Sequence, residues 1–218
     1  ADLINRLRAS HLTFCAGLGK LEHLADALLY CRAKLSGGIY LEAGVAMGGS
    51  AMLMAILKPE GAPLKLYDVF GLLPPPGVRD GAKAQAVYAQ FQSGDLDDPT
   101  SINYLAQAGD LLQSVKRNFA AFGINPASRG VAFIPGLFQD TLRVSEPVAL
   151  AHIDCDWYDS VRYVIEQVKE HLLPGGLIVF DDYDSFEGCR VAMDEWLGQD
   201  GRYRVASHAR TLMVQRIG

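Results

Sequence analysis

Two stretches of the chain, ALAHIDCD at residues 149–156 and LIVFDDY at residues 177–183, each run apolar and then end in paired carboxylates. We interpret both as short buried strands, joined by a helical segment that the PGG sequence at residues 174–176 closes. A strand–helix–strand unit of this length makes its two strands parallel, so both carboxylate pairs emerge at the same edge of a sheet. The sequence therefore predicts an open α/β sheet with a ligand site at the carboxyl ends of its strands.

Strand and helix patterns alternate through the rest of the chain. Strands are expected at 39–43, 64–70 and 131–135, and helices at 18–35, 50–57, 111–122 and 185–197, the last with Asp184 or Ser185 as its N-cap. A terminal hairpin is expected from residues 203–206 and 211–215. This alternation indicates an α/β, doubly wound, Rossmann-like sheet that is mostly parallel. We expect a single domain over residues 1–218, with N-terminal helices at 1–36.

The segment 71–110 interrupts this alternation. PPPG at 74–77 and GDLDDP at 94–99 bracket a helical pattern at 82–91. Insertions of this length between sheet elements are unusual and often serve as active-site lids, although a decorative surface loop is the alternative. The acidic run that contains Asp98 lacks the glycine and glutamate of an EF-hand loop, so we interpret it as solvated surface.

Composition limits the classes of function. The chain has 218 residues, half of them apolar, and a formal net charge of −5. The absence of a basic run argues against a nucleic-acid partner. No apolar run reaches membrane-spanning length, and residues 1–10 lack a signal-peptide core, so we expect a cytoplasmic protein with no membrane partner. Cysteines without metal-finger spacing predict ordinary reduced thiols at Cys15, Cys31, Cys155 and Cys189.

The segment after the first strand reads EAGVAMGGS at residues 42–50. Small residues there let a ligand approach backbone N–H groups at a helix N-terminus. The pattern lacks the GxGxxG spacing of dinucleotide folds and the lysine of a P-loop, so the carboxylate of S-adenosylmethionine fits better than a polyphosphate. A tight turn with no ligand is the alternative. Asp68, at the end of the second strand, either binds ribose hydroxyls or caps a turn.

The paired carboxylates belong to Asp154, Asp156, Asp181 and Asp182. Carboxylates that converge repel one another unless a cation or a proton intervenes. Oxygen ligands select Mg²⁺, Mn²⁺ or Ca²⁺ over thiophilic metals. The alternative is that Asp181 and Asp182 only start a loop while Asp154 caps a helix. We interpret His152 as a core residue rather than a ligand, because it lies within an apolar strand.

Taken together, these segments resemble the macrocin O-methyltransferase family of TylF-like enzymes. The matching stretches are LEAGV at 41–45, YDVF at 67–70, FIPGLFQDTL at 133–142, IDCDWYDS at 153–160 and DDY at 181–183. The likeness covers residues 20–200. It implies a class I methyltransferase fold, S-adenosylmethionine as cofactor, Mg²⁺ or Mn²⁺, and a hydroxylated acceptor such as a sugar or a glycosylated natural product.

Carried over by position, the resemblance also implies roles for single residues. Asp154, Asp181 and Asp182 match the metal ligands, and Asp156 matches the general base. The positions that match the cofactor site are Glu42, Gly44, Ser50, Asp68, Gly136, Leu137 and Phe138. The chain departs from the family pattern at residues 46–47, where Ala-Met replaces an aromatic–basic pair, and at residues 69–74. These departures lie near the cofactor and the insertion, so they bear on the acceptor more than on the reaction.

Three other classes of protein share parts of this pattern. A catechol-type phenolic O-methyltransferase has a lysine shortly after its first metal aspartate, where this chain has Trp157. A nicotinamide-dependent oxidoreductase requires GxGxxG and a catalytic pair, which the sequence lacks. A non-catalytic nucleotide-binding or partner-binding subunit has no use for four carboxylates that are costly to bury. A homo-oligomer is compatible with the sequence.

Overall fold

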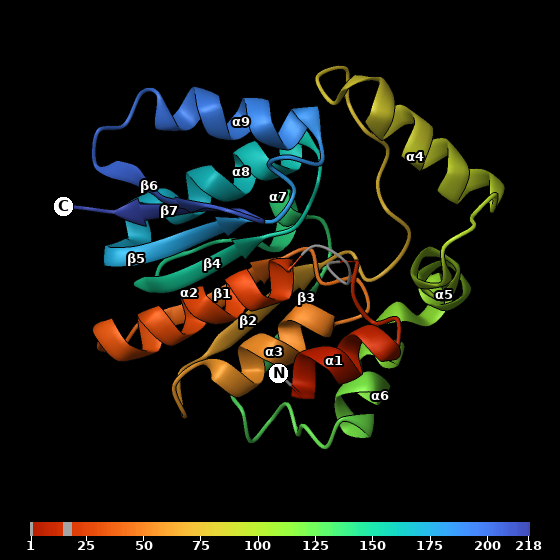
Figure 1. Ribbon diagram of the computed structural model, residues 1–218, viewed down its shortest axis with the longest axis horizontal. Helices are drawn as coiled ribbons and strands as arrows, with labels where there is room; N and C mark the ends of the chain where they lie inside the picture. The colour runs from red at the N-terminus through yellow and green to blue at the C-terminus, as the bar shows by residue number, and fades with distance from the viewer. Residues whose placement is uncertain (1, 15–18) are drawn as a thin grey trace.

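The computed structural model describes residues 2–14 and 19–218 and contains a seven-stranded sheet of order β3-β2-β1-β4-β5-β7-β6 (Figure 1). β1 to β5 pair in parallel, whereas β7 runs antiparallel to both β5 and β6. The strands are β1 (Ile39–Ala43), β2 (Leu64–Asp68), β3 (Val131–Pro135), β4 (Val148–Ile153), β5 (Leu172–Phe180), β6 (Tyr203–His208) and β7 (Leu212–Arg216). The prediction of a doubly wound sheet with an antiparallel terminal hairpin is confirmed. The strand order reverses between β1 and β4, which makes their carboxyl ends the expected ligand site.

Helices cover both faces of this sheet (Figure 1). On one face lie α1 (Asp2–Ala9), α2 (Lys20–Lys34), α3 (Gly49–Leu57) and α6 (Leu111–Ala121), and on the other lie α7 (Phe138–Thr141), α8 (Tyr158–Val168) and α9 (Glu187–Leu197). Neighbouring residues of a strand point to opposite faces, so Tyr40 packs in the cluster with α2 and α3 while Leu41 packs in the cluster with α8 and α9. Residue 18, with which the second helix was expected to begin, lies outside the described residues.

Two local predictions were wrong. The glycines at 175–176 lie inside β5, where the pairing with β4 jumps from Leu172 to Leu177, because they form an irregular bulge rather than a helix stop. The last long helix begins at Glu187 after Phe186, not at a cap on Asp184 or Ser185. Both candidate caps have other partners, since Asp184 binds His208 and Ser185 receives a bond from a lysine described below.

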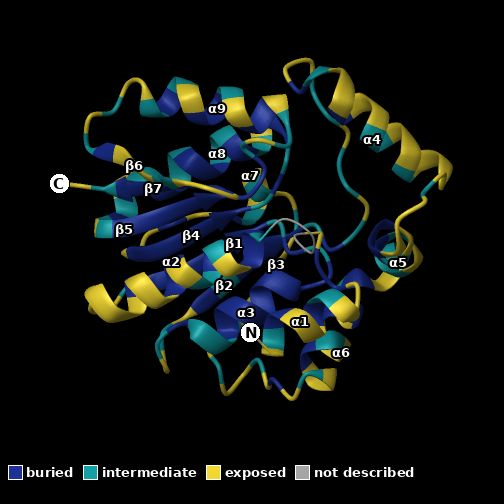
Figure 2. Ribbon diagram, in the orientation of Figure 1, coloured by how far each residue is buried: buried dark blue, intermediate teal, exposed yellow. Residues whose placement is uncertain are grey.

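The insertion at 71–110 contains two α-helices, α4 (Gly81–Ser93) and α5 (Pro99–Gln107), and a 3₁₀ turn at 108–110. The helical pattern at 82–91 is thereby confirmed, whereas α5 was not expected. Asp98 is exposed, as expected for solvated surface, and it also caps α5 by accepting hydrogen bonds from the backbone N–H groups of Thr100 and Ser101. Only Ala84 of α4 is buried, and α4 stands apart from the sheet with a mostly exposed surface (Figure 2).

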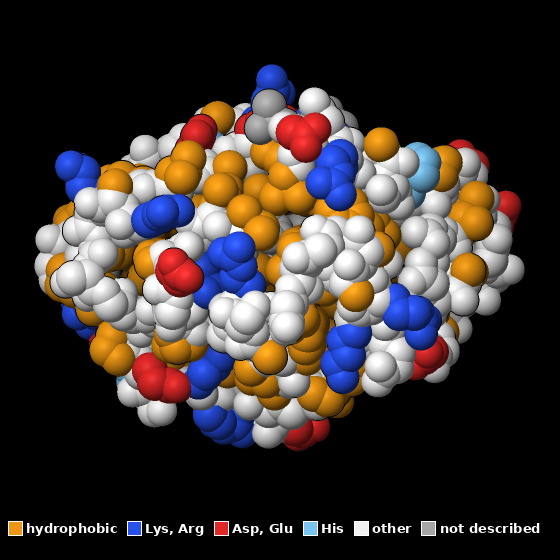
Figure 3. All heavy atoms as spheres, turned by 90° about the horizontal axis from the view of Figure 1, so that it is seen from below, with side chains coloured by type: hydrophobic (Ala, Val, Ile, Leu, Met, Phe, Trp, Pro, Cys, Tyr) orange, Lys and Arg blue, Asp and Glu red, His pale blue; other side chains and the backbone are white. Residues whose placement is uncertain are grey.

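The expectations for membrane spans, surface charge and cysteines concern the chain as a whole. Across residues 2–14 and 19–218, none of the helices has the length and apolarity that crossing a membrane requires. On the face drawn in Figure 3, lysines and arginines are scattered among acidic and apolar side chains. Cys31, Cys155 and Cys189 are free and buried, as expected for ordinary thiols, and Cys15 lies outside the described residues.

Candidate active site

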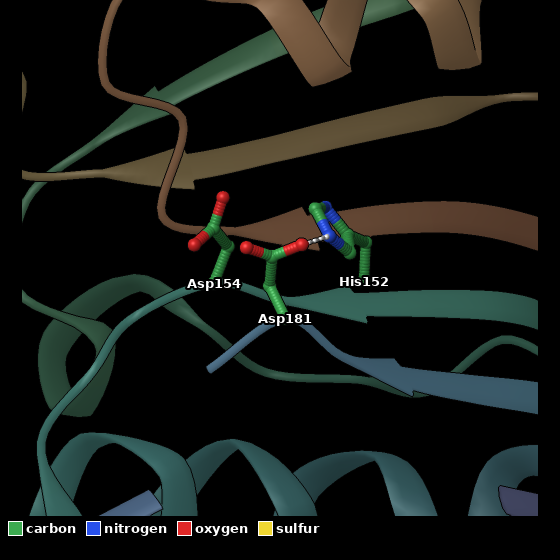
Figure 4. A group of neighbouring side chains, drawn as sticks. All are labelled: His152, Asp154 and Asp181. Carbon is green, nitrogen blue, oxygen red and sulfur yellow. Dashed lines mark ion pairs between the residues drawn. The ribbon is translucent and has the colours of Figure 1, made fainter. Parts of the chain in front are cut away.

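The structure brings the four aspartates together at the carboxyl edge of the sheet. Ile153 pairs with Phe180, so β4 and β5 end side by side and release Asp154 and Asp181 at the same level. The carboxylates of these two residues face one another (Figure 4). One ligand atom each from Asp154, Asp156 and Asp182, and likewise from His152, Asp154 and Asp181, lies within 4.8 Å of the others in its set. This spacing suits ligands of a single metal ion.

The electrostatics of this cluster require a positive charge or protons. Asp181 and Asp182 are buried, and Asp154 and Asp156 are partly exposed to the adjoining cavity. Loss of hydration, together with the charges of Asp181 and Asp182, raises the pKa of Asp154 well above its ordinary value. Loss of hydration and the neighbouring Asp182 likewise raise the pKa of Asp156. A cation that entered the cluster would reduce the repulsion between the carboxylates and favour the ionised forms of Asp154 and Asp156.

Lys20, at the start of α2, supplies a positive charge to this cluster. Its Nζ donates to Asp181 Oδ2 at 2.9 Å, to Asp182 Oδ1 at 3.1 Å and to Ser185 Oγ at 3.4 Å. Although burial lowers it, the charges of Asp182, Asp181 and Asp154 raise the pKa of Lys20 well above the ordinary value. No sequence signal pointed to Lys20, because a lysine on the first turn of a helix resembles a solvated one and its partners lie 161 and 162 residues away.

His152 links the cluster to the sheet beneath it. Its Nδ1 lies 2.8 Å from Glu42 Oε1 and its Nε2 lies 3.5 Å from Asp181 Oδ1 (Figure 4). Although burial lowers it, hydrogen bonds to Asp181 and Glu42 raise the pKa of His152 to about 9. Although burial raises it, the bond to His152 and the charge of Lys20 lower the pKa of Asp181 to about 2. His152 is thus a core residue, as expected, but one that fixes the orientation of Asp181.

A cavity of about 700 Å³ opens in front of the carboxylates. Four of the expected cofactor residues line it: Gly44, Asp68, Leu137 and Phe138. Glu42, Ser50 and Gly136 are not among the described residues that line the cavity, and Glu42 points instead into the sheet toward His152. The insertion supplies much of the apolar wall through Leu73, Pro74, Val87, Phe91 and Tyr104. This size and mixed lining are typical of small-molecule sites.

Asp68 braces the loop after β1. Its Oδ2 accepts hydrogen bonds from the backbone N–H groups of Val45 at 2.6 Å and Ala46 at 3.1 Å, and its Oδ1 accepts one from Phe70 at 2.6 Å. Ala46 and Phe70 have positive φ angles of 45° and 48°, a conformation that side chains other than glycine rarely adopt. Asp68 therefore does cap turns, one of its two predicted roles, and it also faces the cavity.

Position 44 requires glycine because the backbone of Asp154 passes directly against it. Its φ is 91°, and a Cβ atom at this position would lie 1.8 Å from the carbonyl oxygen of Asp154. The glycine therefore permits contact between the loop after β1 and the loop after β4. The sequence suggested that small residues in this loop allow a ligand to approach. Gly44 does line the cavity, but its lack of a side chain is required first by the backbone of Asp154.

Asp156 occupies a tight turn. Its φ is 56°, and the Trp157 N–H donates to the Cys155 carbonyl oxygen at 2.6 Å across it. Trp157, the residue before α8, lines the cavity and packs edge-on against Phe186, the residue before α9, with ring centroids 5.2 Å apart.

Asp80 holds the insertion against the helices behind the cavity. The side chain is 2% exposed, and its Oδ1 accepts from the Tyr158 N–H at 2.6 Å while its Oδ2 accepts from the Gly77 N–H at 2.7 Å. A Cβ atom on Gly188 would lie 1.9 Å from Asp80 Oδ1, so α9 must have glycine there. Asp80 thus stabilises the N-terminus of α8 from a distant segment, a role that no local sequence pattern indicates.

The sheet order, the loop after β1 and the acidic residues at or just after the carboxyl ends of β2, β4 and β5 define a class I methyltransferase fold. The sequence pattern of the macrocin O-methyltransferase (TylF) family matches residues 11–201, so the chain belongs to that family. It is accordingly an O-methyltransferase, and the family implies S-adenosylmethionine as methyl donor.

Relatives of known activity agree with this assignment. The chain is 29% identical to the 8-demethyl-8-(2,3-dimethoxy-alpha-L-rhamnosyl)-tetracenomycin-C 4'-O-methyltransferase of Streptomyces olivaceus, over 85% of the chain and 67% of the relative. It is also 29% identical to the mycinamicin III 3''-O-methyltransferase of Micromonospora griseorubida, over 84% of the chain and 68% of the relative. The solved structure of the O-methyltransferase NovP has the same fold, with a TM-score of 0.74 and 21% identity over 93% of this chain and 81% of that one.

Proposed function

We propose that this chain transfers a methyl group from S-adenosylmethionine to a hydroxyl of a sugar or glycosylated natural product, with Mg²⁺ or Mn²⁺ held by Asp154, Asp181 and Asp182. The observation that carries the proposal is the cluster of four carboxylates beside a cavity with apolar walls. The two relatives described above methylate, by their names, a rhamnosyl-tetracenomycin and mycinamicin III, which supports a small-molecule acceptor.

The donor atoms of the cluster fit a hard divalent cation. They are carboxylate oxygens: one from each of Asp154, Asp156 and Asp182 lies within 4.8 Å of the others, and the same spacing joins one oxygen of Asp154, one of Asp181 and a ring nitrogen of His152. The raised pKa values of Asp154 and Asp156 reflect negative charge that is incompletely balanced by the protein alone. A divalent cation supplies Lewis acidity here, which makes a nearby hydroxyl a better proton donor.

Asp156 is the proposed general base. It lines the cavity, and its position in a tight turn beside the metal ligands lets it meet the acceptor hydroxyl. Loss of hydration and the neighbouring Asp182 raise its pKa, which makes its ionised form a stronger base than an ordinary aspartate. Asp156 then takes the proton of the hydroxyl as its oxygen bonds to the methyl carbon, the carbon–sulfur bond of S-adenosylmethionine breaks and S-adenosylhomocysteine leaves.

The remaining residues position the two substrates. We assign the cofactor to the side of the cavity lined by Gly44, Asp68, Leu137 and Phe138, where the loop after β1 meets the end of β2. The acceptor then lies against the apolar wall of the insertion, which serves as a lid. Covering the site in this way excludes water from the reacting methyl group and holds the oxygen and the methyl at attack distance.

The test is methyl transfer from radiolabelled S-adenosylmethionine to a panel of deoxysugar glycosides and catechols, in Mg²⁺ and in EDTA. We expect transfer to at least one glycoside in Mg²⁺, loss of transfer in EDTA and recovery when Mg²⁺ is restored. Asp154→Asn should abolish transfer, whereas Asp97→Asn, an exposed aspartate of the insertion, should not. Full activity in EDTA would overturn the metal role, and transfer to catechols alone would favour the phenolic alternative.

A further inference from the structure

Lys20 occupies the position that the proposed metal ion requires. Its ammonium group donates to Asp181 Oδ2 at 2.9 Å and to Asp182 Oδ1 at 3.1 Å, and these two residues are proposed metal ligands. Lys20 is 6% exposed, although it starts a helix whose neighbouring positions alternate between buried and exposed. A buried lysine that contacts two buried aspartates places a positive charge beside two of the four carboxylates.

We propose that Lys20 is a tethered cation that neutralises Asp181 and Asp182 by itself, and that a divalent metal binds only by displacing the lysine from them. This inference rests on the proposed metal dependence and adds a residue to it. It also states an order of events: the lysine leaves as the ion enters.

The partners of Asp181 explain why the lysine must leave. Asp181 Oδ1 faces His152 Nε2, and Asp181 Oδ2 accepts from Lys20, so both oxygens of this carboxylate are engaged. His152 is fully buried and is fixed on its other side by Glu42 at 2.8 Å. Lys20 by contrast lines the cavity and holds its charge on a flexible four-carbon stem. An ion that takes Asp181 as a ligand therefore replaces Lys20 and not His152.

Electrostatics favour the exchange. The four carboxylates, when ionised, outnumber the positive charges of Lys20 and protonated His152, so the cluster retains a net negative charge that attracts a divalent ion. The ammonium and the ion also repel each other at short range in a poorly hydrated site. The stem of Lys20 gives the ammonium a route into the cavity without unwinding α2, because Lys20 is the first residue of that helix.

The arrangement reaches beyond the carboxylates. Ser185 Oγ also accepts from Lys20, and the Ser185 carbonyl oxygen accepts from Lys83 Nζ of the insertion at 2.8 Å. Displacement of Lys20 would therefore remove the contact of Lys20 with Ser185 and leave the contact of Lys83 in place.

Direct measurement of Mn²⁺ binding tests the inference without an acceptor. Free Mn²⁺ is followed by electron paramagnetic resonance during titration of the wild-type chain, Lys20→Met and Lys83→Met. Methionine removes the charge and keeps much of the stem, and Lys83 lines the same cavity without contacting an aspartate in the hydrogen bonds that the structure describes. Lys20→Met should bind Mn²⁺ about tenfold more tightly, since apparent affinity falls when a competitor holds the site. Lys83→Met should bind as the wild type does.

The outcomes separate this inference from the metal proposal. Equal or weaker Mn²⁺ binding by Lys20→Met would overturn the displacement, because the ammonium would then neither compete with the ion nor repel it. No binding by the wild type and by Lys20→Met would overturn the metal proposal, and the displacement with it. If Lys20→Met does not fold, Lys20→Arg replaces it: the wider, bidentate guanidinium should weaken Mn²⁺ binding, and unchanged or tighter binding would overturn the inference.

Discussion

The indole nitrogen of Trp157 donates a hydrogen bond to the carbonyl oxygen of Pro74 at 2.8 Å. Trp157 directly follows the proposed base Asp156, and Pro74 begins the proline run of the insertion. Asp80 makes a second attachment through the N-terminus of α8. The insertion therefore has an inner part at 71–80 that is attached to the loop bearing the proposed base, and an outer part, α4 and the segment before α5, in which few residues are buried.

Because residues 71–80 are attached, we expect only the outer part of the insertion to move as a lid. We expect proteases to cut the protein without ligands between residues 81 and 98, and not at 71–80. Cleavage should slow markedly when S-adenosylhomocysteine, Mg²⁺ and acceptor are present, because closure orders the outer part. Mass spectrometry of the fragments locates the cuts. Equal cleavage with and without ligands would mean that the insertion is a fixed wall.

Asp80→Ala should destabilise the fold. The change removes the acceptor of the Tyr158 N–H, leaves a space beside Gly188 and frees the insertion at its base. The expected loss in the free energy of unfolding is about 1–3 kcal/mol, measured by urea denaturation. Asp159→Ala is the matched control, because Asp159 lies at the same helix start but is exposed. A loss of the same size in both variants would assign the effect to charge near α8 and not to the buried contact.

Asp68→Ala should lower both the stability and the affinity for S-adenosylmethionine. It leaves three backbone N–H groups without their acceptor and frees Ala46 and Phe70 from their left-handed conformations. We expect each effect to reach about 1–3 kcal/mol, measured by thermal denaturation and by calorimetry with S-adenosylhomocysteine. Unchanged affinity with reduced stability would restrict Asp68 to bracing the loop.

The buried thiols should be unreactive in the native protein. Burial raises the pKa of Cys31 to about 12, and burial also raises the pKa of Cys189 well above the ordinary value. At pH 8 the thiolate fraction of Cys31 is then only about one in ten thousand, and the thiolate is the nucleophile. Iodoacetamide should label Cys31, Cys155 and Cys189 only after unfolding, as read by peptide mass spectrometry. Rapid native labelling of Cys189 would contradict the burial.

The layout of the sheet could be predicted because each strand carries its own pattern. The apolar runs before Asp154 and Asp181 indicated both the strands and their common edge, and the structure brings those residues together there. Lys20 could not be predicted, since only the packing of α2 against the sheet brings it to Asp181 and Asp182. Asp98 followed by Pro99 was a readable helix start, because proline at the first helical position and aspartate before it are typical of one.

The contact between Gly44 and the carbonyl oxygen of Asp154 has a consequence for how this enzyme can diversify. With no side chain between them, the loop after β1, where we place the methyl donor, and the loop after β4, which bears the proposed metal ligand Asp154, cannot shift independently. Any rearrangement of one displaces the other and disturbs the reaction geometry. The apolar wall comes instead from the insertion, whose outer helix has only Ala84 buried. New acceptors are therefore most readily gained by substitutions in that wall, while the donor half of the cavity stays unchanged.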